Sequence, residues 1–396
     1  MNETNTTQEV PPDLEQKIWD FFAIKNFVVI GLYIPVLLVA ATANLLFIAI
    51  VIKHRYMRRA STYLLINLSI ADLLITLFAM PNAMWSAYTP LYSLGKVGCK
   101  LLTYIQCVSV STSILTITAM SLHRYFAITK PLFGLIYPSF NRCSTAIVII
   151  FLWILSMAIF SPLLWVNQLE EDVLPMPGNA ITLYYCKENW KDFIISRNVM
   201  GIFWFVFVFL IPGLIMLFAY FTMGKVLCCG TQFYEDSTSS YQRERLIRTR
   251  KKVACILLLL ALIFAICWMP HHIANLLNDT DVQEGDTNDT DSDDNEVQNQ
   301  LIKLKDMKRY LLLLGHLNSA LNPIVYVALS KKFRKSIQEL FRRGTCEAQK
   351  DLTRVTLMKL NTLRNPYDSR STTTHAKKRS STLEERDGSN GNGTAH

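Results

Sequence analysis

The sequence places charged and amide side chains inside long apolar stretches, where such groups are costly. Asp72 lies within LSIADLL, and Asn44 is the one amide of the apolar stretch before it. Asn318, Asn322 and Tyr326 are spaced four apart in a later apolar stretch, so they share one face of a helix. An ionisable group at that depth is a functional candidate unless it serves only as a hydrogen-bond hub. Oxygen ligands suit small hard cations, and the residues expected to enclose water and a sodium ion are Asn44, Asp72, Ser113, Asn318 and Asn322.

A second candidate site combines aromatic rings and imidazoles around the segment FAICWMP. Phe264 and Trp268 are one helical turn apart. Pro270 leaves the carbonyl of residue 266 without its helical partner, which predicts a kink. One interpretation is an aromatic core with a structural bend. The other is a hinge, with Trp268 as the floor of a pocket lined by Gln106, His271, His272 and Asn275.

The elements that must hold these residues are membrane-spanning helices. The chain is 51% hydrophobic and 18% charged, which is too apolar for an ordinary soluble enzyme. Seven charge-poor apolar runs are long enough to cross a bilayer. The expected fold is therefore an all-α membrane protein, a seven-transmembrane helix bundle. Its runs are Phe27–Ile52, Leu73–Tyr88 with the apolar turns before Asp72, Leu101–Leu122, Cys143–Gln168, Asn198–Gly224, Val253–Asn278 and Tyr310–Ser330.

The third run shows how such a helix would lie. A helix rises 1.5 Å per residue, so Cys99 and Arg124 would be about 38 Å apart, against roughly 30 Å of hydrocarbon. The run between them contains several serines and threonines, which lipid-facing helices rarely carry. We therefore expect this helix to lie inside the bundle, where its hydroxyls meet neighbouring helices.

Charges in the connecting segments predict the orientation, because short cytoplasmic segments collect Lys and Arg. Basic clusters follow the first and seventh runs and precede the sixth, whereas the alternate loops are acidic, at Glu170–Asp172 and between Asp279 and Glu296. The N-terminus is therefore expected outside and the C-terminus in the cytoplasm of a multi-pass plasma-membrane protein. The net charge of +9 then reflects topology, and no nucleic-acid partner is predicted.

The predicted organisation has four parts. Residues 1–26 form an extracellular N-terminal tail without a visible cleavable signal peptide, and residues 27–330 form the bundle. Residues 331–345 have apolar and basic faces and predict a short amphipathic eighth helix on the inner leaflet, while residues 346–396 are expected to be a disordered cytoplasmic tail. The modification sites predicted are palmitoylation at Cys346 and glycosylation at Asn2, Asn5, Asn278 and Asn288. The threonines and serines of the tail, as at Ser371–Thr374, are accessible to kinases.

Cysteine positions predict one disulfide. Of the nine cysteines, Cys99 and Cys186 are the pair that the predicted topology places outside, where the environment is oxidising. A bond between them would fix the loop after the fourth run over the mouth of the bundle. The cysteines within the runs are interpreted as small packing residues.

These residues together resemble the rhodopsin-like (class A) G-protein-coupled receptors, over about residues 27–343. The markers occur in the expected order, one or more on each helix: Asn44, Asp72, Cys99 with Arg124–Tyr125, Trp153, Pro212 with Tyr220, FAICWMP, NPIVY from Asn322 to Tyr326, and Phe333. The resemblance implies a two-state receptor that an extracellular ligand shifts and that activates a heterotrimeric G protein. It also implies receptor kinases and arrestin as partners of the phosphorylated tail.

The resemblance assigns roles residue by residue. Ile114, Pro212 and Phe264 would form the connector that repacks on activation, and Trp268 would be the switch beneath the ligand. The sodium pocket would comprise Asp72, Ser113, Asn318, Ser319 and Asn322, with Na⁺ as an allosteric ion rather than a cofactor. The group at the inner end would be His123, Arg124, Tyr125, Tyr220 and Tyr326.

Three departures from the family pattern carry expectations. His123 stands where the family has an acidic residue, and Arg250 and Lys251 stand where many members have an acid. We therefore expect appreciable signalling without agonist. Ala43 replaces a common Gly, which is a mild change, and the outer segment from Asp279 to Arg309 is unusually long and acidic.

The resemblance also limits the classes of ligand that we expect. Amine receptors have an Asp where this chain has Gln106, and opsins have a Lys at the depth of His316. Gln106, the acidic segments and Glu188 instead resemble neuropeptide receptors, which predicts a cationic peptide, including amidated ones. The alternatives are a lipid or other small molecule, and a seven-span transporter. No nucleophile–base pair, metal-ligand cluster or phosphate loop supports an enzyme. The predicted ligand-binding residues are Gln106, Glu188, Trp268, His271, His272, Asn275 and His316.

Overall fold

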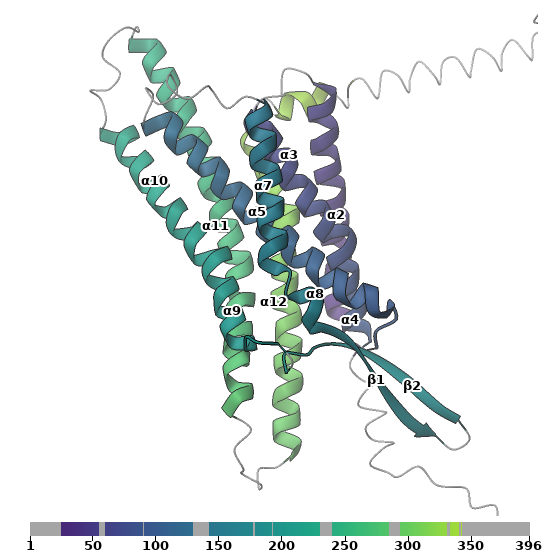
Figure 1. Ribbon diagram of the computed structural model, residues 1–396. Helices are drawn as coiled ribbons and strands as arrows, with labels where there is room; N and C mark the ends of the chain where they lie inside the picture. The colour runs from purple at the N-terminus through teal and green to yellow at the C-terminus, as the bar shows by residue number, and fades with distance from the viewer. Residues whose placement is uncertain are drawn as a thin grey trace, which may run out of the picture. The chain divides into compact units, whose positions relative to one another are not determined.

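A computed structural model describes residues 25–54, 60–89, 91–129, 142–176, 179–191, 193–229, 240–284, 294–330, 333–339 and 342. The chain divides into two compact units, Met1–Phe333 and Arg334–His396. The first unit is a bundle of long helices, with a two-stranded hairpin at one end (Figure 1). In the part that is described, seven helical stretches are long and apolar enough to cross a membrane, as predicted.

The spans are made of the following elements. The first is α2 (Phe27–Lys53), and the second joins α3 (Ala60–Leu74), a π-helical turn (Ile75–Ala79) and α4 (Met80–Tyr88). The third is α5 (Gly95–Thr129) and the fourth α7 (Arg142–Phe160). The fifth joins α9 (Arg197–Phe205), a second π-helical turn (Val206–Leu210) and α10 (Ile211–Cys229), and the last two are α11 (Ser240–Glu284) and α12 (Asp294–Leu329).

Both π-helical turns lie just before a proline. The first ends at Ala79, two residues before Pro81, and the second ends at Leu210, two residues before Pro212. A proline removes a backbone donor and crowds the preceding turn, so the helix widens there instead of continuing regularly. At Pro81 the helix therefore changes its helical type, which rotates the residues beyond it.

Helix α5 supplies much of the buried interior of the bundle. Its buried residues include a run of hydroxyl side chains, Ser109, Ser111, Thr112, Ser113 and Thr116. Two of them bond to other helices: Asn67 Nδ2 donates to Thr116 Oγ1 at 2.8 Å, and Ser156 Oγ donates to Ser111 Oγ at 3.1 Å. The predicted interior position of this helix is confirmed.

Several element boundaries differ from the prediction. The fourth span ends at Phe160 rather than Gln168, because a turn at Pro162 and the short helix α8 (Leu163–Val166) follow it. Helix α11 runs to Glu284 and α12 begins at Asp294, so helical backbone covers part of the segment read as a long acidic loop. Hydropathy marks where a helix leaves the bilayer, not where it ends.

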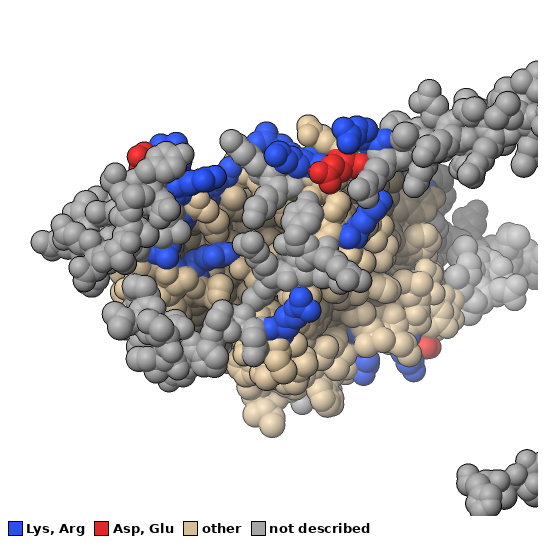
Figure 2. All heavy atoms as spheres, turned by 90° about the horizontal axis from the view of Figure 1, so that it is seen from above, with Lys and Arg blue, Asp and Glu red and all other residues tan. Residues whose placement is uncertain are grey.

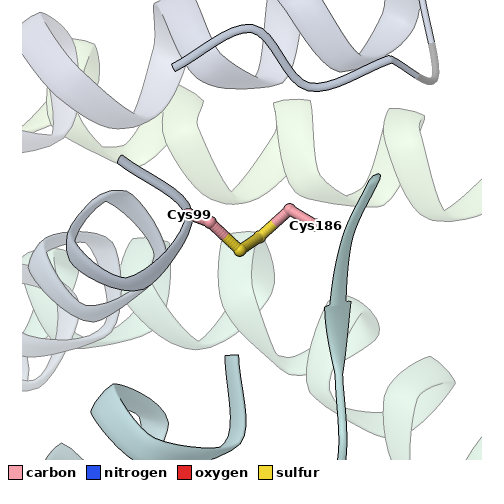
Figure 3. Close-up of a disulfide and its surroundings, with 2 residues drawn as sticks. All are labelled: Cys99 and Cys186. Carbon is pink, nitrogen blue, oxygen red and sulfur yellow. A yellow bond between two sulfur atoms is a disulfide. The ribbon is translucent and has the colours of Figure 1, made fainter. Parts of the chain in front are cut away.

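The segment after α8 is a β-hairpin, whereas its acidic sequence predicted only a loop. Strand β1 (Asn167–Met176) pairs with β2 (Asn179–Glu188) antiparallel from Asn167 opposite Glu188. Cys186 of β2 and Cys99 of α5 form the expected disulfide, with their Cα atoms 5.5 Å apart (Figure 3). The backbone N–H of Tyr92 also donates to the carbonyl of Tyr184 at 2.8 Å. The hairpin is therefore fixed to the bundle at two neighbouring points of one strand.

The two ends of the bundle differ in charge. We call the end with the hairpin the hairpin end, and the opposite end, where α5 finishes after Arg124, the Arg124 end. Figure 2 views the Arg124 end, where Lys and Arg side chains (blue) are more frequent than Asp and Glu (red) among the described residues. Basic residues on the helix ends there include Lys53, Arg142, Lys225, Arg248 and Arg250.

Several predicted features lie outside the described residues. These are the N-terminal sequons at Asn2 and Asn5, the sequon at Asn288, Cys346 and the tail from residue 346. Asn278 belongs to α11, but its side chain is also outside the description. Of the predicted eighth helix, residues 333–339 are helical.

Candidate functional site

A cavity of about 260 Å³ opens between α5, α9, α11 and the hairpin. Six of the seven predicted ligand-binding residues line it: Gln106, Glu188, Trp268, His271, His272 and Asn275. The seventh, His316, is fully buried behind Trp268, with the two ring centroids 5.8 Å apart. The structure therefore brings these six residues together around one cavity, with the Trp268 ring buried in its lining.

The carboxylate of Glu188 is the acidic group of this cavity, and it already has partners. Trp190 Nε1 donates to its Oε2 at 3.0 Å, and Arg197 Nε lies 3.5 Å from the same oxygen. Both charged side chains are partly exposed, so the ion pair alone contributes little stability. The cavity thus contains an ion pair, Glu188 with Arg197, and not an isolated negative charge. The sequence did not indicate this pair.

Aromatic side chains form the wall between α7 and the fifth span. Trp204 stacks on Phe160 at 5.3 Å and meets Trp190 edge-on at 6.0 Å, while Phe209 lies 4.1 Å from the His272 ring. None of Trp190, Trp204, Phe209 and Arg197 was predicted as a lining residue. An aromatic residue in a membrane helix gives no sequence signal of the face it occupies, especially past a π-helical turn.

The acidic patch Glu170–Asp172 lies on β1, outside the cavity lining. Lys187 Nζ is 3.0 Å from Glu170 Oε2 across the hairpin, and both groups are well exposed. Partial burial raises the pKa of the nearby Tyr185, Asp172 adds to this rise, and Lys187 opposes it. The patch is thus partly compensated within its own hairpin.

A cluster of buried polar side chains, which we call the polar chamber, lies between α2, α3, α5 and α12. Asn322 Nδ2 donates to Asp72 Oδ2 at 3.0 Å, and Asn44 Nδ2 donates to the carbonyl of Ser319 at 2.9 Å. Side-chain oxygens of the set have no protein partner among the described residues: Asp72 Oδ1, Ser113 Oγ, Asn318 Oδ1, Ser319 Oγ and Asn322 Oδ1. Buried polar atoms of this kind normally bind water or an ion, so the residues present fit the predicted sodium site.

The residues of the predicted connector are buried below the cavity. Phe264 is buried between Phe209, at 5.7 Å, and Trp268, at 6.4 Å. Ile114 and Pro212, the other residues of the predicted connector, are buried as well.

A second cavity, of about 190 Å³, opens at the Arg124 end. Its lining includes Ser61, His123, Arg124 and Tyr326 among apolar residues of α3, α5, α11 and α12. Arg124 Nη2 donates to Ser61 Oγ at 2.8 Å. The cavity combines a guanidinium group with apolar walls.

Two tyrosines of the predicted inner group lie apart from this cavity. The hydroxyl of Tyr220 is 2.6 Å from Ser121 Oγ. Tyr125 packs against Phe126 and Phe218, with ring centroids 5.2 and 5.9 Å apart. Arg124 and Tyr326 therefore line the same cavity, whereas Tyr220 is hydrogen-bonded to Ser121 outside it.

Comparisons with known proteins agree with this arrangement. The sequence model of the seven-transmembrane receptors of the rhodopsin family matches residues 43–326. The chain is 27% identical over 315 residues to a QRFP-like peptide receptor of Branchiostoma floridae, covering 78% of this chain and 76% of that protein. It is 26% identical over 347 residues to a Substance-P receptor of Aquarana catesbeiana, covering 86% of this chain and 74% of that protein.

Proposed function

Since the chain belongs to the rhodopsin family of seven-transmembrane receptors, a membrane family of receptors and not of enzymes, we propose that it is a receptor for an extracellular neuropeptide. The observation that carries this proposal is the cavity at the hairpin end, which gathers Gln106, Glu188 and Trp268 beneath a disulfide-linked hairpin. The names of the two relatives, a QRFP-like peptide receptor and a Substance-P receptor, support a peptide ligand.

The cavity favours a peptide end that carries an aromatic ring and a polar group. Trp204, Phe209 and Trp268 offer ring faces, and Gln106 and Asn275 offer amides that both donate and accept hydrogen bonds. A terminal carboxamide is complementary to such amides. A cationic side chain would bind at Glu188, where it must replace Arg197.

We propose that the second cavity receives a heterotrimeric G protein. It lies at the opposite end of the bundle from the hairpin and contains Arg124 and Tyr326. Ligand binding would change the packing of Trp268 and Phe264, which are in contact, and movement of α11 would widen the cavity around Arg124. Such a receptor has two states, and an agonist acts by binding the active one more tightly.

The buried chamber would hold a sodium ion in the resting state. Asp72 would supply the charged ligand, and hydroxyl and amide oxygens of Ser113, Ser319 and Asn318 would complete the site. The support for this assignment is the set of buried oxygens that have no protein partner among the described residues. When bound, the ion would supply the positive charge that an ionised Asp72 otherwise lacks at this depth.

The orientation proposed puts the N-terminus outside the cell. The basic residues on the helix ends at the Arg124 end support a cytoplasmic position for that end. The hairpin and its disulfide would then face the oxidising exterior. Phosphorylated residues of the C-terminal tail would recruit arrestin after receptor kinases act.

A peptide screen tests the proposed function. Cells that express the full chain would be exposed to neuropeptides, with guanine-nucleotide exchange as the readout. We expect a peptide response that Gln106→Ala weakens by about tenfold, because an amide that lines the cavity and can bond to the peptide is lost. Triple alanine substitution at Glu170–Asp172 tests whether the acidic hairpin attracts the peptide. A response confined to lipids or other small molecules, or substrate flux without exchange, would overturn the proposal.

A further inference from the structure

The Trp268 indole is in contact with the bare backbone of α12 at Gly315. A Cβ atom at Gly315 would lie 2.9 Å from both Cε3 and Cζ3 of the Trp268 ring. Such distances are shorter than real carbon contacts allow, and the atoms involved belong to a rigid, buried ring. The present position of the indole therefore requires that residue 315 has no side chain.

The next residue of α12 closes the same side of the indole. The His316 ring lies 5.8 Å from the Trp268 ring at an interplanar angle of 75°, so the two rings meet edge to face. His316 and Trp268 are both buried. We call Gly315 and His316 the indole seat. Gly315 leaves room for the indole because it has no side chain, and the His316 imidazole packs against the ring.

The seat is held from the first span. The hydroxyl of Tyr33 on α2 lies 3.1 Å from Nδ1 of His316, and the Tyr33 ring is also buried. A hydrogen bond in such surroundings fixes the imidazole orientation, because neither partner can turn to water instead. Helix α2 itself lines neither of the two cavities described above, yet it fixes the orientation of a ring that packs on the floor of one of them.

We propose that Gly315 and His316 position the Trp268 indole in its resting orientation, and that Tyr33 holds this seat from the first span. The inference rests on the proposed function in one respect, namely that Trp268 is the switch beneath the ligand. It adds that the resting position of this switch is set by residues of α2 and α12 that do not line the ligand cavity. Loss of the seat then favours the active state without any ligand.

The first test is a thermal-stability cycle on the purified full chain in lipid nanodiscs, which needs neither ligand nor G protein. Gly315→Ala should lower the unfolding midpoint by about 2–4 °C or more, since the added methyl overpacks a filled site. In a Trp268→Leu background the same substitution should cost much less, because the smaller side chain leaves room. Equal losses in both backgrounds, or no loss in either, would overturn the proposal.

The chain offers matched controls for Gly315→Ala and for Tyr33→Phe, the substitution that removes the hydroxyl bonded to His316. Gly31→Ala adds a methyl on α2 where no atom lies within 4 Å of the new Cβ, so it should not lower the midpoint. Tyr104→Phe removes a hydroxyl that donates to the Met157 carbonyl at 3.1 Å, on another side of the bundle. These controls separate a specific seat from a general effect of helix substitution.

The second test measures G-protein nucleotide exchange without agonist, at matched receptor amounts. Tyr33→Phe should raise it about two- to tenfold, the factor expected for one net hydrogen bond. Gly315→Ala should also raise it, because the new methyl displaces the indole, whereas Tyr104→Phe and Gly31→Ala should not. Unchanged exchange with an active parent receptor would overturn the regulatory part of the proposal. If no variant and no parent catalyses exchange, the proposed G-protein coupling fails, and the stability cycle alone decides whether the seat exists.

Discussion

At the scale of single residues, His123 is the substitution with the clearest expected consequence. It precedes Arg124, whose guanidinium donates to Ser61 in this structure. His123→Asp would place a carboxylate beside that guanidinium and favour its resting position. We expect exchange without agonist to fall about tenfold or more, because a hydrogen bond to a charged group contributes about 1.5–3 kcal/mol. Agonist-free exchange should be measured for both proteins.

The neutral variant His123→Asn is the matched control, because it changes size in the same way without adding charge. It should not lower the basal exchange. A parent receptor no more active than an inert control, or an Asp variant as active as the parent, would contradict the prediction.

Asp72 provides a second prediction at this scale. If the buried chamber holds sodium in the resting state, replacing Na⁺ by K⁺ in the buffer should raise basal exchange. Asp72→Asn removes the charged ligand, so the difference between the two salts should disappear. Ser109→Ala is a suitable control, because Ser109 is equally buried on α5 but is not part of the predicted site. A sodium effect that persists in the Asn variant argues against this site.

The pair of Glu188 and Arg197 leads to a third prediction. Their side chains are 3.5 Å apart in the cavity, so a cationic peptide must displace Arg197 before it can pair with Glu188. Arg197→Gln should therefore increase the potency of a cationic agonist by about three- to tenfold, and Glu188→Gln should reduce it by a similar factor. The potency of peptide analogues in which arginine is replaced by citrulline should depend on neither substitution. If the two substitutions changed the potency of the arginine peptide and of its citrulline analogue equally, an ionic role of Glu188 and Arg197 would be refuted.

At the scale of elements, the hairpin depends on the Cys99–Cys186 bond. The bond closes a segment with a sequence separation of 87, for which the chain-entropy model gives about 4–5 kcal/mol of stabilisation. Replacing both cysteines by Ser should lower the unfolding midpoint and weaken the response to peptide, because β2 carries Glu188 beside the cavity. Thermal unfolding and agonist potency check the two effects.

The control for this prediction is Cys143→Ser, at an exposed position of α7. It removes a thiol without opening a covalent loop. If the control were as harmful as the double substitution, the loss could not be assigned to the disulfide.

A comparison of elements shows which features of the structure could be predicted from the sequence alone. The seven spans follow from runs of apolar residues, and the polar chamber follows from the spacing of Asn318 and Asn322 and from the placement of Asp72 in an apolar run. The hairpin was missed because β1 contains three consecutive acids, which read as a solvated loop. The aromatic wall was missed because aromatic residues are frequent along the apolar fifth span, so their presence does not indicate which of them face the cavity. The Glu188–Arg197 pair joins different elements and leaves no local pattern.

At the scale of the whole molecule, two cavities lie at opposite ends of one bundle. The path between them contains the Trp268–Phe264 contact and the chamber around Asp72. A packed interior has discrete arrangements rather than continuous ones, so a change at one cavity can select a different arrangement at the other. The first span takes part through Tyr33, although it borders neither opening.

The charge difference between the two ends gives the last prediction, which concerns the orientation of the chain. An odd number of spans puts the two termini on opposite sides, and the Lys and Arg residues at the Arg124 end favour the cytoplasm there. An epitope placed before residue 1 should therefore bind antibody on intact cells, whereas one placed after residue 396 should bind only after permeabilisation. Labelling of both epitopes on intact cells would contradict seven spans. The reverse pattern would put Arg124 outside the cell, where no G protein could reach it.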